Sequence, residues 1–575
     1  MIKVSRLAPV AAALCVAFNA YGQTTPIQHV IVLFQENISF DHYFGTYPNA
    51  KYAGGATDPA GGAPFYVGGY TPTVNGYTPD LLNNNPNRNT LGVQRNPQRL
   101  TAAQAYTCSQ NHNYGPEQAA VDGGLLDKFP AFTGRTTSEG CASDGGTVMD
   151  YFDGNTVTAF WNYAQNYAMS DNSFGSTFGP STPGALNLVS GQTYGGTTHF
   201  GSGSTASYPN TVTSPVTDIG DFDAYLDDCG ADKGGSVTTT TTLEMNPDAT
   251  ASTGNRNIGD LLNAAGVTWG WFQGGFAPTV AATATTPAVC GSAHTTHTSI
   301  SGAITVPNPA APFVTGADIH TLGSDYVSHH EPFQFYASTR NPHHLRPTSV
   351  AAIGTTDQAN HQYDTSDFFA ALSNGNLPAV SFVKAPYLYN GHPGNSDPIM
   401  EQVWITQVVN AVMQNPAWGS TAIIIAYDDS DGWYDHVTGP VVSPSNVTIT
   451  GQAAAYDNYA GVGNCGTPQT GALPARCGHG PRLPLLVVSP YANANYVDHT
   501  LTDQASIINF IESNWTLGYI DGATAPANGL ASFDRNAGSL NGLFNFNISP
   551  NTTALLLKCN GDYALSASQA CQVGN

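Results

Sequence analysis

The stretch His29-Val-Ile-Val-Leu-Phe34, followed directly by Gln35-Glu36-Asn37, decides the fold of this chain. Apolar residues at successive rather than alternate positions are typical of a strand buried on both faces. Three similar runs are Ala379–Val383 (AVSFV), Thr421–Ala426 (TAIIIA) and Leu485–Val488 (LLVV). Because helix-like segments such as Met400–Met413 lie between these runs, we predict an α/β fold: a three-layer sandwich around a mostly parallel central sheet.

Acidic and amide side chains come directly after two of these strands. Glu36 and Asn37 follow the first run, and Asp428 and Asp429 follow the third. Ligand sites of open α/β sheets lie at the carboxyl ends of strands. Carboxylates brought together there repel one another unless a cation is present, and oxygen ligands suit Mg²⁺, Ca²⁺, Mn²⁺ or ferrous iron. We predict one divalent metal ion bound by these four residues; the alternative is that they are ordinary turn residues.

A serine lies at a predicted helix start in Phe178-Gly-Pro-Ser181-Thr-Pro183. Proline suits the first turn of a helix, so the helix should begin near Ser181. The simplest interpretation is that Ser181 caps the helix. The same geometry also directs a hydroxyl and backbone N–H groups towards one point, which would form an anion site. The segment is not a lipase elbow, because Gly-x-Ser-x-Gly would require glycine at position 183.

Several histidines occur in loops rich in Gly, Pro and Asn. They are His112, the pair His329 and His330, His392 and His436. A lone histidine is usually structural, but several in loops near strand ends favour phosphate binding and proton transfer.

The first residues have the features of a secretory signal peptide. Lys3 and Arg6 precede an apolar run from Leu7 to Phe18, and small residues around Ala20 and Gly22 follow. The run is shorter than the ~20 residues needed to span a bilayer. We therefore predict a signal peptide over residues 1–22, a secreted or periplasmic protein, and no stable membrane insertion.

The remaining cysteines and the net charge fit an exported protein. Eight cysteines remain after Cys15, and among them Cys465 with Cys477 and Cys559 with Cys571 are close enough in sequence to form local disulfides; the other pairings stay open. Without the signal peptide, 15 basic residues against 40 acidic ones give a formal net charge of −25. This charge argues against a nucleic-acid partner.

The candidate site residues are scattered from Glu36 to Asp429, which predicts a single catalytic domain over residues 23–575. Two stretches rich in small and polar residues, near 52–96 and 201–315, are expected to be long loop insertions. The second contains one ordered piece, a helix from Asp260 that stops at Gly266, followed by a strand from Val267 to Phe272.

Together these residues resemble a known family, the bacterial phosphoesterase family that contains secreted acid phosphatases and phosphatidylcholine-type phospholipases C. The matching blocks are His29–Gly45 (HVIVLFQENISFDHYFG), Tyr114–Gly124 (YGPEQAAVDGG), Phe178–Pro183 (FGPSTP), His329–Phe333 (HHEPF), Tyr427–His436 (YDDSDGWYDH), Pro481–Pro484 (PRLP), Ser489–Tyr491 (SPY) and Asp498–Thr500 (DHT). The first and fifth blocks are specific, and the order of the blocks covers most of the chain. Two positions depart from the common pattern: Ile38 replaces an arginine, and Asp429 replaces a glutamate.

The resemblance implies an alkaline-phosphatase-like core with Glu36, Asn37, Asp428 and Asp429 as metal ligands and Ser181 as nucleophile. It also implies that His112, His329 or His330, and His392 surround the phosphoryl group. We assign His112, His329 and His330 to substrate binding. His392 is our candidate for protonating the leaving alkoxide.

The sequence therefore predicts an acid phosphatase that acts on small phosphorylated substrates through a phosphoserine. The alternative within the family is a phospholipase C that recognises phospholipid head groups. Phospholipase members commonly have an additional β-rich C-terminal region, whereas here roughly 75 residues follow Thr500. Serine at position 181 also favours the phosphatase. A weaker alternative, a secreted carbohydrate-binding protein, leaves the clustered histidines and strand-end acids unexplained.

Overall fold

The computed structural model describes residues 23–56, 58–138, 140–200, 216–230, 241–245, 256–290, 325–442, 477–522 and 532–573. The predicted signal peptide, Cys465 and much of the predicted insertion 201–315 lie outside these residues.

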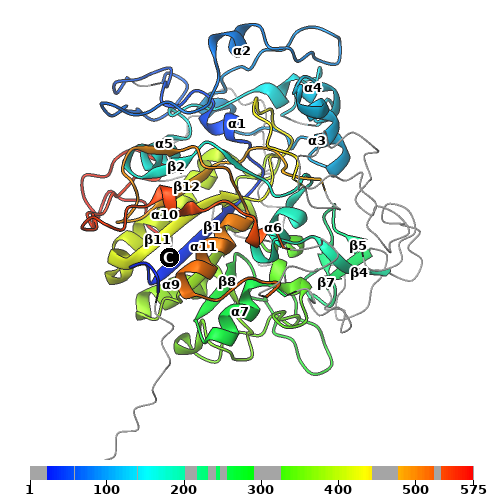
Figure 1. The fold of residues 1–575 in the computed structure, drawn as a ribbon, viewed down its shortest axis with the longest axis vertical. Coiled ribbons are helices and arrows are strands. Elements are labelled where there is room, and N and C mark those ends of the chain that lie inside the picture. Colours follow the sequence, from blue (N-terminus) through cyan, green and yellow to red (C-terminus); the bar gives the residue numbers. More distant parts are fainter. Residues whose placement is uncertain are drawn as a thin grey trace, which may run out of the picture.

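A central eight-stranded sheet organises the chain (Figure 1). Its strands, in spatial order, are β13 (Tyr496–Asp498), β2 (Ala168–Ser170), β12 (Leu485–Val488), β11 (Thr421–Tyr427), β1 (His29–Gln35), β10 (Val380–Lys384), β8 (Trp269–Gln273) and β9 (Gln362–Asp364). Within this sheet β12 is antiparallel to both of its neighbours, and all the other pairings are parallel. The prediction of a mostly parallel sheet is confirmed, and the run Leu485–Val488 forms its one reversed strand.

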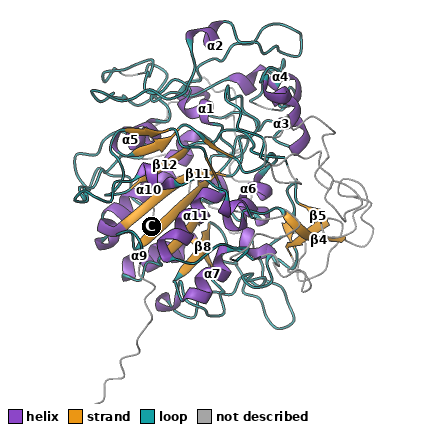
Figure 2. Ribbon diagram, in the orientation of Figure 1, coloured by secondary structure: helices purple, strands orange, loops and turns teal. Residues whose placement is uncertain are grey.

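The helices form two groups that cover the two faces of the sheet (Figure 2). In one group α10 contacts α5, and Phe369 of α9 packs against Trp404 of α10; in the other, α6 contacts both α7 and α11. All residues of β11, and all of β1 after His29, are buried, as expected for strands covered on both faces. These layers make the α/β sandwich predicted from the sequence.

The α-helices of the described residues are α1 (Phe40–Phe44), α2 (Pro79–Asn83), α3 (Tyr114–Val121), α4 (Phe129–Phe132), α5 (Thr158–Asn166), α6 (Ser181–Ser190), α7 (Ile258–Ala265), α9 (Thr365–Asn374), α10 (Pro398–Met413) and α11 (Ala505–Trp515). Local sequence explains where they begin and end. The Asp397 side chain accepts hydrogen bonds from the backbone N–H groups of Ile399 and Met400, which caps α10. The predicted stop at Gly266 ends α7.

The ordered piece predicted within 201–315 is part of the central sheet itself. Its strand, β8, pairs in parallel with β10 on one side and with β9 on the other, and all five of its residues are buried. This piece is therefore not an excursion on the core. A separate four-stranded sheet, which the sequence did not indicate, has the order β5 (Val216–Thr217), β4 (Tyr194–Phe200), β7 (Thr241–Met245) and β6 (Asp223–Ala224).

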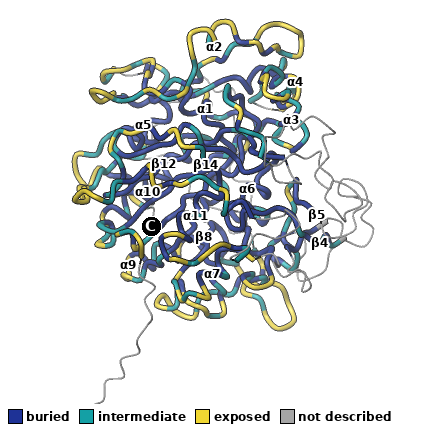
Figure 3. Tube along the Cα trace, viewed as in Figure 1, coloured by how far each residue is buried: buried dark blue, intermediate teal, exposed yellow. Residues whose placement is uncertain are grey.

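A second, smaller hydrophobic cluster lies beside the main core and includes α3, α4 and the segment around Phe178. It consists of Tyr114, Ala120, Val121, Leu126, Phe129, Val148, Met149, Phe178, Ile219, Tyr434 and Cys477. Figure 3 shows the contrast between the buried central sheet and the exposed loops around α2. Among the described residues, no helix has both the length and the apolar character needed to cross a lipid bilayer.

Three disulfides join described cysteines: Cys108 to Cys141, Cys229 to Cys290, and Cys559 to Cys571. The predicted local pairing of Cys559 with Cys571 is confirmed. The predicted pairing of Cys465 with Cys477 involves Cys465, which lies outside the described residues.

Candidate active site

Three adjacent strands bring charged residues to one edge of the sheet. β1 lies between β11 and β10, and Phe34 is in register with both Ala426 and Lys384. Because the three strands are parallel, the residues at their carboxyl ends meet. Glu36, Asp428 and Lys384 converge there, and all three are nearly inaccessible to solvent.

The loops after β1 and β11 are joined by their backbones. The N–H of Asn37 donates to Asp428 Oδ1 at 2.9 Å, and the N–H of Ile38 donates to the carbonyl oxygen of Asp429 at 3.0 Å. Asn37 adopts a φ of 62°, a left-handed conformation that asparagine tolerates better than most residues. These bonds hold the four predicted metal ligands in one buried cluster.

The donor set of this cluster fits a hard divalent cation. The Asn37 Nδ2 donates to Asp431 Oδ1 at 3.2 Å, whereas its Oδ1 is buried and has no hydrogen-bond partner among the described residues. Burial, and then the charge of Glu36, raises the pKa of Asp428; burial, and then Asp428, raises the pKa of Asp429 well above its usual value. An orphaned amide oxygen beside crowded carboxylates is what a cation would satisfy.

Lys384, which the sequence analysis missed, lies inside the same cluster. Its Nζ forms an ion pair with Glu36 and lies 3.4 Å from Asp428 Oδ2. Burial alone would lower the pKa of Lys384, but Asp428 and Glu36 raise it. A fixed positive charge therefore offsets part of the negative charge. The signal was present in the sequence, because Lys384 follows the run AVSFV just as Glu36 and Asp428 follow their runs.

Ser181 is the first residue of α6, and its hydroxyl points into the acidic cluster. Its Oγ lies 3.1 Å from Asp429 Oδ2 and 3.4 Å from Glu36 Oε2. Pro180 occupies the N-cap position and no side chain caps the helix, so the capping interpretation of Ser181 is wrong. Two nearby backbone donors are already engaged: the N–H of Thr182 bonds to Asp221 and that of Gly179 bonds to Glu117. The expected anion site thus depends on the hydroxyl more than on these N–H groups.

A glycine allows α6 to approach β11 closely. A Cβ atom on Gly184 would lie 2.1 Å from the carbonyl oxygen of Asp428, which is far too close for any side chain. The absence of a side chain at this position therefore sets the distance between Ser181 and the loop that carries Asp428 and Asp429.

The two adjacent histidines make different contacts. His330 Nδ1 lies 2.9 Å from Glu36 Oε1, whereas His329 Nδ1 lies 3.8 Å from Asp223 Oδ1. Burial, followed by His329 and Lys384, lowers the pKa of His330 well below its usual value. Burial opposes the charge of His329, but Asp221 and Asp223 raise its pKa. His330 thus joins the acidic cluster, and His329 lies outside it with its ring packed against that of His330.

His112 and His392 lie together on another side of the cluster. His112 Nδ1 is 3.0 Å from Asp431 Oδ1, and the two histidine rings are 5.7 Å apart in an edge-to-face arrangement. Burial would lower the pKa of His112, but Asp429 and Asp431 raise it well above its usual value. Nitrogen and oxygen atoms of His112, His392 and Asp431 lie within 4.8 Å of one another.

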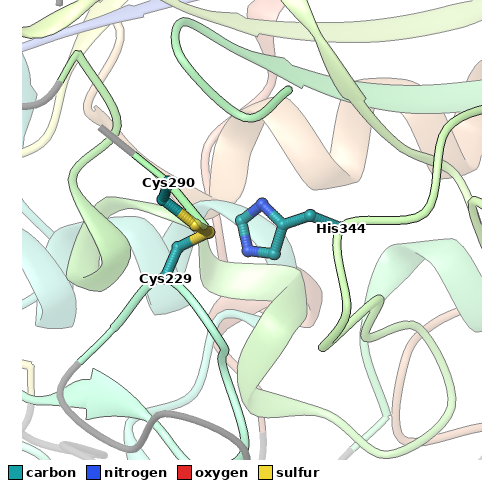
Figure 4. Close-up of side chains that lie close together, drawn as sticks. All are labelled: Cys229, Cys290 and His344. Carbon is teal, nitrogen blue, oxygen red and sulfur yellow. A yellow bond between two sulfur atoms is a disulfide. The ribbon is translucent and has the colours of Figure 1, made fainter. Parts of the chain in front are cut away.

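Two other groups of potential metal ligands are engaged elsewhere. His436 bonds to Asp41 at 2.5 Å, and this pair belongs with Asp435 to a buried network around Arg482 rather than to the site. Figure 4 shows His344 beside Cys229 and Cys290, whose sulfur atoms are bonded to each other. Because the sulfurs form a disulfide, they do not offer the thiolates that zinc prefers.

Comparisons with known proteins agree with the resemblance stated from the sequence. A model of the Phosphoesterase family matches residues 27–518. The chain is 24% identical over 533 residues to phospholipase C B of Mycobacterium tuberculosis, which covers 92% of this chain and 80% of the relative.

Shorter matches reach higher identity. Non-hemolytic phospholipase C of Burkholderia pseudomallei is 34% identical over 175 residues, or 30% of this chain and 23% of the relative. Non-specific phospholipase C6 of Arabidopsis thaliana is 28% identical over 138 residues, or 23% of each chain. In the Burkholderia relative the match thus spans about a quarter of the protein.

Proposed function

Because the chain belongs to the Phosphoesterase family, we propose that it hydrolyses phosphoric esters with Ser181 as the nucleophile. The observation that carries this proposal is the position of the Ser181 hydroxyl, at the start of α6, against carboxylates delivered by two different strands. A hydroxyl that only caps a helix bonds to backbone N–H groups of that helix and does not require carboxylates beside it. We also propose that the central sheet and the helices on its two faces form an alkaline-phosphatase-like core.

The metal belongs to the same proposal. Glu36, Asn37, Asp428 and Asp429 would bind a divalent ion, which would supply Lewis acidity to the reaction. Lys384 keeps a positive charge beside two of these ligands. Its ammonium group lowers the cost of bringing the carboxylates together in a buried site.

The chain's own residues provide the remaining steps. Ser181 forms a bond to phosphorus as the bond to the leaving oxygen breaks. Its hydroxyl proton passes to the neighbouring Asp429 carboxylate, and His392 donates a proton to the leaving oxygen. His112 and His330, which contact the cluster through Asp431 and Glu36, bind the phosphoryl oxygens. Water then attacks the phosphoserine and gives a proton to His392, while the Ser181 oxygen leaves phosphorus and takes its proton back from Asp429. This step releases phosphate or a phosphomonoester and restores the Ser181 hydroxyl.

The substrate class has two candidates. The relatives named above are phospholipases C, which favours a phosphodiester such as phosphatidylcholine. The second candidate is a phosphate monoester, favoured by serine at position 181, the residue that the family's phosphatases use.

A direct comparison of kcat/KM for p-nitrophenyl phosphate and for phosphatidylcholine in mixed micelles decides between them. Either preference supports phosphoester hydrolysis and assigns the substrate. No turnover of either ester by metal-loaded protein would overturn the proposed function.

We further propose that the protein is exported by the segment 1–22. The three disulfides among described residues support an oxidising compartment. The test is the N-terminal sequence of the protein recovered outside the cytoplasm, which should begin at Gln23. Met1 at the terminus of the exported protein would contradict this proposal.

A further inference from the structure

The buried carboxylate of Glu117 connects the two loops that carry the candidate nucleophile and the metal-binding acids. Glu117 lies in α3 and is 2% exposed. Its Oε2 accepts a hydrogen bond from the N–H of Gly179 at 2.9 Å, and its Oε1 accepts one from Ser430 Oγ at 2.6 Å. Gly179 is two residues before Ser181, and Ser430 directly follows Asp429.

The turn before Ser181 requires this acceptor. Gly179 adopts a φ of 115°, a conformation open to glycine and strained for other residues. In that conformation its N–H reaches the Glu117 carboxylate of α3. A buried N–H without an acceptor would destabilise the turn, so Glu117 fixes the conformation that leads into Ser181.

The other end of the bridge fixes the loop after β11. Ser430 Oγ donates to Glu117 and also accepts a hydrogen bond from the N–H of Gly432 at 2.9 Å. Glu117 is held in place because its helix, α3, packs with Phe178 in the smaller hydrophobic cluster. One side chain from outside the central sheet therefore holds both partners of the Ser181–Asp429 contact.

We propose that Glu117 is a positioning residue that sets the placement of Ser181 relative to Asp429. The inference rests on the proposed function, because the benefit of this placement is in-line attack by the serine hydroxyl. Misplacing reacting groups by about 1 Å can lower a rate by roughly 100-fold. The effect should therefore appear in kcat rather than in KM.

Glutamine is a close substitute for this side chain. Burial raises the pKa of Glu117 to about 7, while the hydrogen bonds from Ser430 and Gly179 lower it. When the carboxyl group is neutral, one of its oxygens accepts from Gly179 and the other donates to Ser430 Oγ, which reverses the bond that Ser430 makes to the carboxylate. An amide has the same shape and the same pattern of one acceptor and one donor. The leucine side chain has a similar size but offers neither an acceptor nor a donor.

Glu117→Gln, Glu117→Leu and Gln118→Leu form a matched set. Gln118 is the next residue of α3, is fully buried, and its side-chain nitrogen and oxygen have no hydrogen-bond partner among the described residues. Gln118→Leu therefore tests a polar-to-apolar change in the same helix without touching either loop.

The experiment measures kcat and KM for the better of the two esters named above, together with thermal unfolding and bound metal. We expect Glu117→Leu to lose roughly 100-fold in kcat, with KM changed less than about threefold. The kcat of Glu117→Gln should stay within about threefold of the wild-type value. Gln118→Leu should have the same kcat and KM as wild type. A Glu117→Leu enzyme with normal kcat, or equal losses in Glu117→Leu and Gln118→Leu, would overturn the inference. An inactive wild-type enzyme would instead overturn the proposed function. If Glu117→Leu does not fold, a Glu117→Gln enzyme with a large kcat loss at unchanged thermal stability would count against the bridge.

Discussion

Ser181 Oγ and Asp429 Oδ2 lie 3.1 Å apart although 248 residues separate them in the chain. Two different elements bring them together, because Ser181 begins α6 and Asp429 follows β11. The contact is buried, with Ser181 1% and Asp429 3% exposed.

Loss of one carboxylate should remove the metal. Asp428→Asn keeps the shape of the side chain but replaces a charged ligand beside Glu36 and Lys384 with a neutral one. We expect the variant to lose its divalent ion on dialysis and to fall by roughly 100-fold or more in kcat. Elemental analysis and a steady-state assay measure both quantities.

Asp150→Asn serves as the control, because that buried carboxylate pairs with Arg95 away from the cluster. It should retain both metal and activity. Full activity of Asp428→Asn after the metal has been removed would contradict the assignment of the metal site.

A methyl group on Gly184 should displace the nucleophile. Gly184→Ala places a Cβ against the Asp428 carbonyl oxygen, so α6 must move away from β11. We expect kcat to fall by about tenfold to 100-fold. Ala185→Gly, one residue along the same helix, costs about 1 kcal/mol of helix stability without adding that contact, and it should leave kcat nearly unchanged. Equal kcat values in Gly184→Ala and wild type would show that this close approach has no role in catalysis.

The His436–Asp41 pair should make stability depend on pH. Burial would lower the pKa of His436, but Asp41 raises it above the usual value of about 6.5. Because the folded state holds the proton more tightly than the unfolded state, the pair's contribution is full below about pH 6.5 and is lost as the pH rises through the folded pKa.

The measurement is urea unfolding of wild type and His436→Asn at about pH 5.5 and about pH 9. We expect His436→Asn to lower the free energy of unfolding by about 1.5–3 kcal/mol at the lower pH and by clearly less at the higher pH. A difference that does not change with pH would mean that the charge of His436 does not stabilise the fold.

Much of the fold could be predicted because its signals are local. A strand buried on both faces produces an apolar run whatever its neighbours are, and a helix such as α7 shows its own stop at Gly266. Strand direction is not local. Burial on both faces is the same for a parallel and an antiparallel strand, so Leu485–Val488 gave no sign that β12 is reversed. The small sheet containing β4 was missed because its strands, as in Tyr194–Phe200, are rich in Gly and Thr rather than in apolar residues.

The sequence placed four residues of the candidate cluster from their positions after β1 and β11, but it missed Lys384 at the end of β10 and Glu117 in α3. Glu36, Asn37, Asp428 and Asp429 cluster because two adjacent strands end there. Lys384 was overlooked because lysine usually lies at the surface, although it occupies an equivalent strand end. Glu117 is a helical residue, and nothing in its local sequence shows that its carboxylate contacts Gly179 and Ser430. Such contacts depend on the packing of α3 against the rest of the chain.

In the proposed mechanism Ser181 attacks phosphorus and forms a phosphoserine. A supporting test is Ser181→Ala, which removes the nucleophile without disturbing a helix cap, because the serine makes no capping bond. We expect kcat to fall by roughly 1,000-fold or more with thermal stability nearly unchanged.

The most direct measurement is the stereochemistry at phosphorus, obtained with a chiral thiophosphate ester in isotopically labelled water. Attack by Ser181 followed by attack of water on the phosphoserine comprises two in-line displacements, each of which inverts phosphorus. We therefore expect net retention of configuration. Net inversion would mean a single displacement by water, and it would contradict the role of Ser181 as nucleophile.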